Sequence, residues 1–248
     1  MFDWPAMKGW ARHYTFGLRK EWLDYYLQNW PEWEKGAPLG NRQVDSLKVW
    51  VKTAGLEDSG GRMTPLGVLF RKRGTDCMLL WELSWVKVVF NFPTARWYAH
   101  LGIGSWTTTE LKKLLRLAIP RLKERTFSSA INELAGLCER TPLGEKLGQG
   151  EVVYYKGIRR LFRRGFEPGE EAIMLAVVHL FHEEKRKKLF FASDLTWPWV
   201  VFGCRREAVL GRLLCIKQNL FYITEDGITI IGDEGEKERW LNGNILNF

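Results

Sequence analysis

A phrase that occurs twice places the strongest constraint on how this chain folds. Ala54-Gly55-Leu56 precedes Thr64-Pro65-Leu66-Gly67, and Ala135-Gly136-Leu137 precedes Thr141-Pro142-Leu143-Gly144. Each copy follows an amphipathic segment, Gly commonly follows the end of a helix, and Thr-Pro suits the start of the next one. We therefore expect a helix, a stop, a loop and a capped restart in both places. Such repetition indicates duplicated supersecondary units.

The first unit is expected over residues 1–100. Its early part, Trp10 to Gln28, has the pattern of a turn followed by a helix that ends before Pro31. Asn41 to Thr53 is amphipathic and predicts a second helix. Thr64 then begins a third helix, so this unit is helical and resembles a winged helix in its helix pair.

The second unit is expected over residues 101–165. Its first helix begins at the Thr107-Thr108-Thr109-Glu110 cap and runs to Pro120, and its second covers Ser128 to Leu137. This pair repeats the helix-loop-helix pattern of the first unit.

The third unit is expected over residues 166–248. Glu170 to Glu184 and Cys204 to Lys217 predict helices, and two β-rich runs around Asp226-Gly227 predict a hairpin. A helix followed by a hairpin is the order of a winged helix. The predicted fold class is therefore mainly α with small β hairpins, arranged as tandem winged-helix-like units.

The charge of the chain favours a polyanionic partner. The formal net charge is +8, and the sequence pI is near 9.3. Cationic side chains that contact phosphates release condensed counterions, which drives binding to nucleic acid. Basic residues gather in six clusters: Arg71-Lys72-Arg73; Lys112-Lys113 with Arg116; Arg121, Lys123 and Arg125; Arg159-Arg160 with Arg163-Arg164; Lys185-Arg186-Lys187-Lys188; and Arg205-Arg206.

Candidate DNA-contacting residues follow from the helix pairs. In a helix-turn-helix, base contacts come from the start of the second helix, and Arg, Asn and Gln pair with base edges. The candidates are Asn41, Arg42, Gln43, Ser46 and Lys48 in the first unit, Arg125, Ser128, Ser129 and Asn132 in the second, and Arg205, Arg206 and Arg212 in the third. The open alternative is that these helices only pack together or bind protein.

The chain contains 13 Trp. Large aromatic side chains bury much area, yet complete burial of all of them is not expected. We expect the surplus on grooves or interfaces, where it would anchor partners.

Catalytic residues are poorly indicated. His179 and His182 lie three positions apart beside Glu183, but no third metal ligand is evident, so we expect a structural role for the pair. His13, Arg19, His182 and Glu183 are the weak catalytic candidates, and the catalytic residues and metal ligands are otherwise unknown. Nicking of DNA would need Mg²⁺ or Mn²⁺ held by carboxylates. The available carboxylates have uninformative spacing: Glu21, Asp24, Glu183, Glu184 and Asp194.

The chain resembles the bacterial family called domain of unknown function 4007. The resemblance covers about the first 150 residues well and the rest loosely. Tyr14 stands where the family usually has Glu, which argues against a hydrolytic role for this phrase. The matching positions are His13, Thr15, Phe16, Arg19, Trp22 and Leu23; Leu39, Gly40, Ser46 and Trp50; Gly55, Leu56 and Thr64 to Gly67; Asp76, Trp81 and Trp85; and Trp97-Tyr98.

The resemblance implies a role in DNA phosphorothioation, in which sulfur replaces a non-bridging phosphate oxygen. Such proteins act with a cysteine desulfurase, an ATPase and an adenylating sulfur-transfer enzyme. In single-strand systems the corresponding B component is thought to nick DNA so that sulfur can be inserted. The resemblance therefore implies a component of bacterial defence of the restriction-modification kind.

Three hypotheses remain open. The first is a DNA-binding component of phosphorothioation with nicking activity. The second is a non-catalytic, regulator-like adaptor that reads DNA and recruits the sulfur-transfer enzymes, and the third is a protein-interaction scaffold. Self-association as a homodimer is open for each. With no signal-peptide or membrane-length apolar run, we expect a cytoplasmic protein without a membrane partner.

Overall fold

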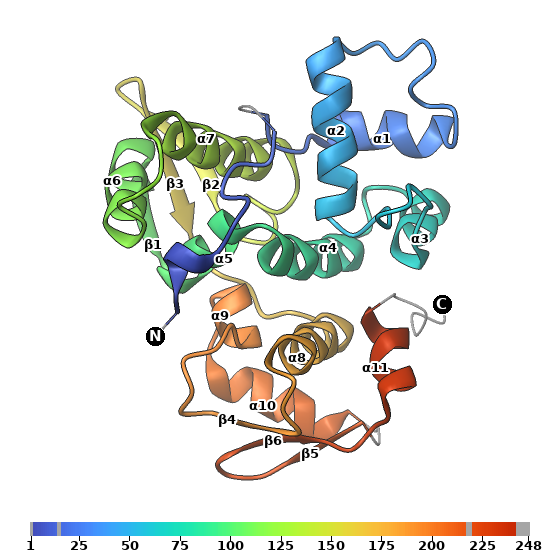
Figure 1. Cartoon of the computed structure of the whole chain (residues 1–248), viewed down its shortest axis with the longest axis vertical. Coiled ribbons are helices and arrows are strands. Elements are labelled where there is room, and N and C mark those ends of the chain that lie inside the picture. The colour runs from blue at the N-terminus through green and yellow to red at the C-terminus, as the bar shows by residue number, and fades with distance from the viewer. Residues whose placement is uncertain (1, 14–15, 217–219, 242–248) are drawn as a thin grey trace.

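The computed structural model describes residues 2–13, 16–216 and 220–241, which fold mainly into helices with two small antiparallel sheets (Figure 1). Helices make up 52% of the described residues and strands 11%. The predicted mainly α class with small β elements is confirmed. Tyr14, Thr15 and Lys217 lie outside the described residues.

The first part of the chain is helical. The short 3₁₀ helix η1 is followed by α1, which buries Trp22, Leu23, Tyr26 and Leu27. Thr64 caps α3, because its hydroxyl accepts a hydrogen bond from the Gly67 backbone N–H at 3.2 Å. The elements are η1 Trp4–Ala6, α1 Lys20–Asn29, α2 Asn41–Thr53, α3 Pro65–Arg73, α4 Met78–Asn91 and α5 Pro93–His100.

A three-stranded sheet follows, with the order β1-β3-β2. Trp106 pairs with Leu161 across β1 and β3, and Val152 pairs with the same Leu161 from β2. Thr107 and Glu110 form a capping box at the start of α6, as the sequence predicts. The elements are β1 Gly104–Thr107, α6 Thr108–Ala118, α7 Glu124–Arg140, β2 Glu151–Tyr155 and β3 Ile158–Arg163.

The last part of the chain repeats this order of elements. Its strands pair as β4-β6-β5, so the first strand again lies beside the last, and the predicted hairpin around Asp226-Gly227 joins β5 to β6. Figure 1 shows this part below α4 and α5. The elements are α8 Glu170–Glu184, β4 Lys188–Phe190, α9 Pro198–Phe202, α10 Arg206–Cys215, β5 Phe221–Ile223, β6 Gly227–Ile230 and α11 Glu234–Leu241.

The repeated phrase does not mark a repeated structure, and this prediction is wrong for the second copy. Gly136 lies inside α7 instead of after it, and the Thr141 phrase forms turns where a helix was expected. The reason for Gly136 is a close approach of the chain at Gly17. A Cβ on Gly17 would lie 2.2 Å from the Leu137 backbone nitrogen, and one on Gly136 would lie 3.3 Å from that of Gly17. Here Gly serves packing between segments.

Nine of the 13 Trp side chains are buried, whereas Trp4, Trp30, Trp106 and Trp199 are half-buried. Burial is therefore incomplete, as expected, and the placement of the surplus on grooves or interfaces stays a prediction. No Trp is among the exposed large hydrophobic residues of the described chain, whose exposed aromatics are Tyr and Phe. Indole N–H groups donate to backbone carbonyls, as Trp50 does to Phe16 at 2.6 Å and Trp85 to Val201 at 2.7 Å. The buried Trp are Trp10, Trp22, Trp33, Trp50, Trp81, Trp85, Trp97, Trp197 and Trp240.

Two hydrophobic cores meet at α8. One includes residues from Trp10 to Phe202, and the other includes residues from Ile173 to Trp240. Helix α8 contributes Leu175 to the first core and Val177 to the second. The division into three units at residues 100 and 165 stays a prediction. No helix in the described residues has the length and apolarity required to cross a bilayer.

Arg163 is a buried structural residue, although the sequence places it in a basic cluster. Its guanidinium donates to the carbonyls of Ala99 at 2.7 Å and Val201 at 2.9 Å. It also donates to Gln149 Oε1 and to the carbonyls of Gly102 and Val200. Burial lowers the pKa of Arg163 to about 10, so the guanidinium remains a cation that satisfies these acceptors. Arg163 therefore joins β3 to the ends of α5 and α9.

Candidate nucleic-acid interface

The hairpin between β2 and β3 presents aromatic side chains to solvent. Tyr154 is 61% exposed and Tyr155 is 67% exposed, and Ile158 on the facing strand is also exposed. Lys156 and Gly157 both have positive φ, of 48° and 76°, which is the backbone of a tight two-residue turn. Exposed aromatic rings at a hairpin tip are accessible to a partner, and bases stack on such rings.

A groove beside this hairpin is lined by three Arg side chains. Arg19 precedes α1, Arg140 ends α7, and Arg159 comes from β3. The groove has a volume of about 360 Å³, and its remaining lining residues are Phe16, Gly17, Asn132, Gly136 and Glu139. Segments far apart in the sequence thus bring three guanidinium groups together.

The groove has an excess of positive charge. Burial lowers the pKa of Arg19, and the nearby Arg140 cation lowers it further. The Arg19 guanidinium also lies over the Trp22 ring, with its carbon 4.5 Å from the ring centroid. Glu139 is the one carboxylate that lines the groove, and it pairs with Arg159 at 2.5 Å. Glu21 and Glu139 both act on Arg19. Three cations still outnumber these two carboxylates, so an anion in the groove would be stabilised.

Glu139 also holds the hairpin in place. Its Oε1 accepts a hydrogen bond from the Tyr154 hydroxyl at 3.0 Å, while its Oε2 accepts from Arg159. The hairpin is therefore tied to the last turn of α7, and the exposed aromatic tip has a defined position relative to the three Arg side chains.

The N-terminal segment covers the middle of α7. Glu133 is buried and accepts hydrogen bonds from the backbone N–H groups of Arg12 at 2.5 Å and His13 at 3.2 Å. Together with the contact between Gly17 and Gly136, these bonds hold the segment against the helix. The middle of α7 is thus unable to enter a DNA groove, whereas its two ends remain accessible.

The candidates on α7 are divided by this arrangement. Arg125 is exposed and Ser128 is half-buried in the first turns of the helix, whereas Ser129 is buried and does not reach solvent. Asn132 lines the groove together with Arg19, so the structure brings these two sequence candidates together.

The candidates on α2 contribute mainly to its own structure. Gln43 Oε1 accepts from the Gly40 N–H at 3.1 Å and closes the start of the helix. Ser46 is buried and its hydroxyl lies 3.4 Å from the Phe16 carbonyl. Lys48 pairs with Glu34 at 2.6 Å. Asn41 and Arg42 are exposed at the first turn, on a helix separate from α7 (Figure 1).

The candidates on α10 lie in the lower part of the molecule, away from the groove (Figure 1). Arg205 is exposed, with Glu167 at 3.8 Å. The Arg206 guanidinium lies over the Phe191 ring at 4.6 Å, and Arg212 donates to the Pro168 carbonyl at 2.7 Å. These contacts occupy Arg206 and Arg212 within the fold.

The weak catalytic candidates do not converge. Glu183 accepts from the buried Arg96 at 2.6 Å, and His182 is exposed on α8. His13 lies in the N-terminal segment, and Arg19 lines the groove. The described residues contain no group of three or more His, Cys, Asp or Glu arranged to hold a metal ion.

Sequence reasoning missed the exposed hairpin and the position of Arg140. The signal for the hairpin was present, because Lys156-Gly157 separates Val152 to Tyr155 from a second β-rich run, and Gly157 suits a turn with positive φ. Arg140 carried no local signal, because its role depends on segments that meet only in the folded chain.

We expect Glu133 to make the protein less stable as the pH rises. Burial raises the pKa of Glu133 from its ordinary 4.5 to about 8, despite opposing hydrogen bonds from Arg12 and His13. A carboxyl whose pKa is raised by folding binds its proton more tightly in the folded state, so stability is full below pH 4.5 and falls toward pH 8. In the Glu133→Gln variant the side chain at position 133 does not ionise between pH 4.5 and pH 8. Over this range the free energy of unfolding of the wild type should therefore fall by about 2 kcal/mol more than that of the variant.

Urea unfolding at several pH values measures this difference. Glu145→Gln, an exposed carboxylate on the following turn, is the matched control and should follow the wild type. Parallel curves for Glu133→Gln and the wild type would show that Glu133 titrates normally.

Comparison with known proteins identifies no relative. No family model matches this chain, and no curated protein or solved structure is significantly similar to it.

Proposed function

We propose that the chain is a DNA-binding protein built on two winged-helix units, and that it holds DNA with the β2–β3 hairpin and the adjacent three-Arg groove. The observation that carries this proposal is the placement of the exposed Tyr154 ring, which shares Glu139 with Arg159, beside the groove lined by Arg19, Arg140 and Arg159. Aromatic rings that stack and cations that contact phosphates are the two components of nucleic-acid interfaces.

The order of elements supports the winged-helix interpretation. Both sheets follow the pattern helix, strand, helix, helix, strand, strand, with the first strand beside the last. This is the order of a winged helix, in which the final hairpin is the wing. In the first of these units α7 takes the place of the recognition helix. Because the N-terminal segment covers its middle, we infer that the wing and the ends of α7 make the contacts.

A variant at the hairpin tip tests this function. Tyr155→Ser combined with Lys156→Asn should weaken binding to a short DNA duplex about tenfold, because a base or sugar contact and a phosphate contact are lost. Asn tolerates the positive φ of residue 156, so the turn is retained. Fluorescence anisotropy with a labelled duplex measures the change.

Tyr222→Ser is the matched control for the tip variant. Tyr222 is 62% exposed on β5 of the second sheet, away from the groove. This variant should bind within about twofold of the wild type, as expected for a surface change outside the interface. If the tip variant binds the duplex with unchanged affinity, the hairpin is not part of the interface.

Within this function, we propose the role implied by the resemblance: the DNA-binding component of a phosphorothioation system that works with the ATPase and the sulfur-transfer enzyme. The non-catalytic adaptor is the form that the described geometry supports best, because the groove offers cations and aromatic rings that bind. The nicking form is distinguished by incubating supercoiled plasmid with Mg²⁺ or Mn²⁺. Metal-dependent relaxed circles that disappear in Arg19→Ala, His13→Ala or His182→Ala would establish nicking and locate its site.

A further inference from the structure

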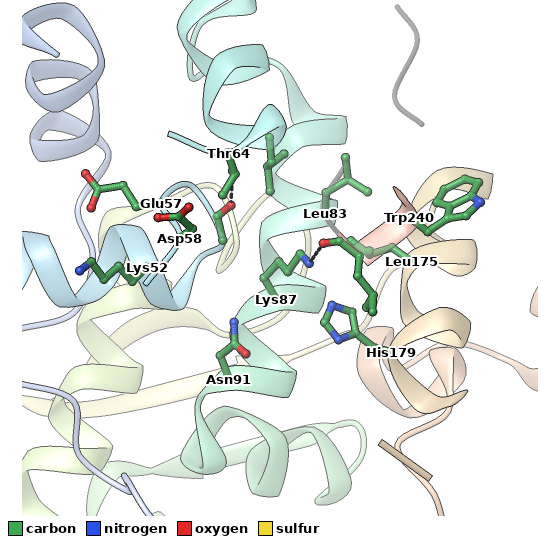
Figure 2. Close-up of a pocket in the computed structure, with 13 residues that line it drawn as sticks. Lys52, Glu57, Asp58, Thr64, Leu83, Lys87, Asn91, Leu175, His179 and Trp240 are labelled. Carbon is green, nitrogen blue, oxygen red and sulfur yellow. Dashed lines mark hydrogen bonds between the residues drawn. The ribbon is translucent and has the colours of Figure 1, made fainter. Parts of the chain in front are cut away.

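A second cavity lies between α4 and α8, on the side of the molecule opposite the hairpin. The end of α2 and the loop before α3 form one wall, and the end of α11 forms another (Figure 2). Its volume is about 210 Å³. Sites for drug-sized ligands usually have about 300–1,000 Å³, so an occupant of this cavity must be small.

The walls of the cavity are mainly apolar. Leu66, Leu83, Leu175 and Trp240 contribute hydrophobic surface from four different elements. Figure 2 shows Lys87, His179 and Asn91 on the floor between these walls. An apolar pocket with a few convergent polar groups is the usual form of a small-molecule site.

Lys87 is half-buried at this site, and none of the described carboxylates pairs with it. Its Nζ donates to the Leu241 backbone carbonyl, which is a neutral acceptor. Burial alone lowers the pKa of Lys87 to about 8. An ammonium group in an apolar setting is costly unless an anion accompanies it. The cavity therefore contains a cation that an anionic ligand would stabilise.

His179 supplies a second polar group. The ring stacks on Phe90 with 4.7 Å between centroids, and its Nε2 is buried without a hydrogen-bond partner among the described residues. Burial and the nearby Lys87 cation hold its pKa well below the ordinary value, so the ring is neutral. A neutral ring can donate one hydrogen bond through nitrogen. Buried polar groups without partners are rare in folded proteins, and each calls for an explanation.

The carboxylates of the cavity are occupied elsewhere. Glu57 accepts from the Tyr26 hydroxyl at 2.9 Å, and Asp58 accepts from Arg62 at 2.8 Å. Asn91 donates to the Thr53 carbonyl at 3.1 Å. The Lys87 end of the cavity is thus the positive end.

We propose that this cavity binds a small, largely apolar carboxylate, whose anionic group lies against Lys87 Nζ beside the His179 ring and whose body packs between the leucines and Trp240. The carboxylate supplies the missing counter-charge, and the apolar body fills the space that water would otherwise occupy. A cationic ligand would meet Lys87 with like charge. A neutral ligand of the same shape would leave the ammonium unpaired. The site is independent of the proposed DNA-binding function.

Three probes that share a phenyl ring and differ in charge test the site. Benzoate, benzyl alcohol and benzylammonium are titrated into the full chain at neutral pH and followed by ligand-observed NMR. Benzoate should bind about tenfold more tightly than benzyl alcohol, or more, because a partly buried ion pair increases affinity by about this factor. Benzylammonium should bind least. Equal binding of the three probes, or no benzoate binding at millimolar concentrations, would overturn the proposal without using a variant.

Two Lys variants identify the counter-ion. Lys87→Met keeps the length and volume of the side chain in an apolar environment, and it should remove the preference for benzoate over benzyl alcohol. Lys52→Met removes an ammonium group at the mouth of the same cavity and should preserve that preference. A preference that survives in Lys87→Met would show that Lys87 does not hold the carboxylate.

Discussion

Replacing Arg19, Arg140 and Arg159 together with Gln should weaken binding to duplex DNA about 100-fold at moderate salt, because each guanidinium contributes about one phosphate contact. All three side chains line the same groove, and Glu139 is the one carboxylate among its lining residues. Anisotropy titrations of one labelled duplex with the wild type and the variant measure the loss.

The matched control removes the same charge from another surface. Arg71, Lys72 and Arg73 form an exposed basic run at the end of α3, away from the hairpin (Figure 1). Their triple Gln variant has the same net charge as the groove variant. If the two variants lose affinity equally, attraction is a property of overall charge, and the groove is not a specific contact.

Arg163→Met should lower the free energy of unfolding by about 3–5 kcal/mol, because removing one partner of a buried, charged hydrogen-bond network leaves the others unsatisfied. The guanidinium donates to Gln149 and to four backbone carbonyls from two other segments. Met fills part of the space but donates no hydrogen bond. Urea unfolding measures the change.

Arg164→Met is the control, since the two Arg are adjacent in sequence and differ in burial. Arg164 is exposed, and its interactions with Glu145 and Glu151 lie at the surface. A surface substitution of this kind should change stability by less than about 0.5 kcal/mol. Comparable losses in the two variants would mean that Arg163 has no special role in joining α5, β3 and α9.

Local sequence patterns predict seven of the helices, whereas four others had no prediction from local pattern: α4, α5, α9 and α11. Capping chemistry identifies the starts of α3 and α6, where Thr64 and Thr107 accept hydrogen bonds from the first turn. The hairpin around Asp226-Gly227 follows from its turn residues. These features depend on residues within a few positions of one another, so they can be predicted from one sequence.

The errors arise where distant segments meet. Gly136 has the local signature of a helix end, yet its role is to let Gly17 approach α7. Arg163 has the signature of a solvated basic cluster, yet its side chain is 0% exposed. Neither contact has a signal within the surrounding residues, because each depends on tertiary packing.

The candidate site was predicted only in part. Arg19 and Asn132 were identified separately, one from the N-terminal phrase and the other from the expected recognition helix, and the groove brings them together. Ser46 and Ser129 were expected at an interface, but both are buried. Helical spacing does not show which face of α2 or α7 another segment covers.

The basic side chains of this chain have different roles at different places in the fold. Several basic residues pair with carboxylates, at the surface as Lys48 does with Glu34, or through a buried guanidinium as Arg96 does with Glu183. The groove differs because its cations outnumber the carboxylate that lines it. We therefore expect binding to depend on a few positions more than on the net charge of +8.

The most direct test of the account is the salt dependence of duplex binding by the wild type and by the groove variant. Contacts to Z phosphates give a slope of log K against log salt of about −0.9Z. We expect the wild type to have a slope of about −3 or steeper, and the groove variant to have a slope less steep by about 2 to 3. Wild-type binding that is absent or insensitive to salt, or equal slopes for the two proteins, would contradict the claim that this groove holds DNA.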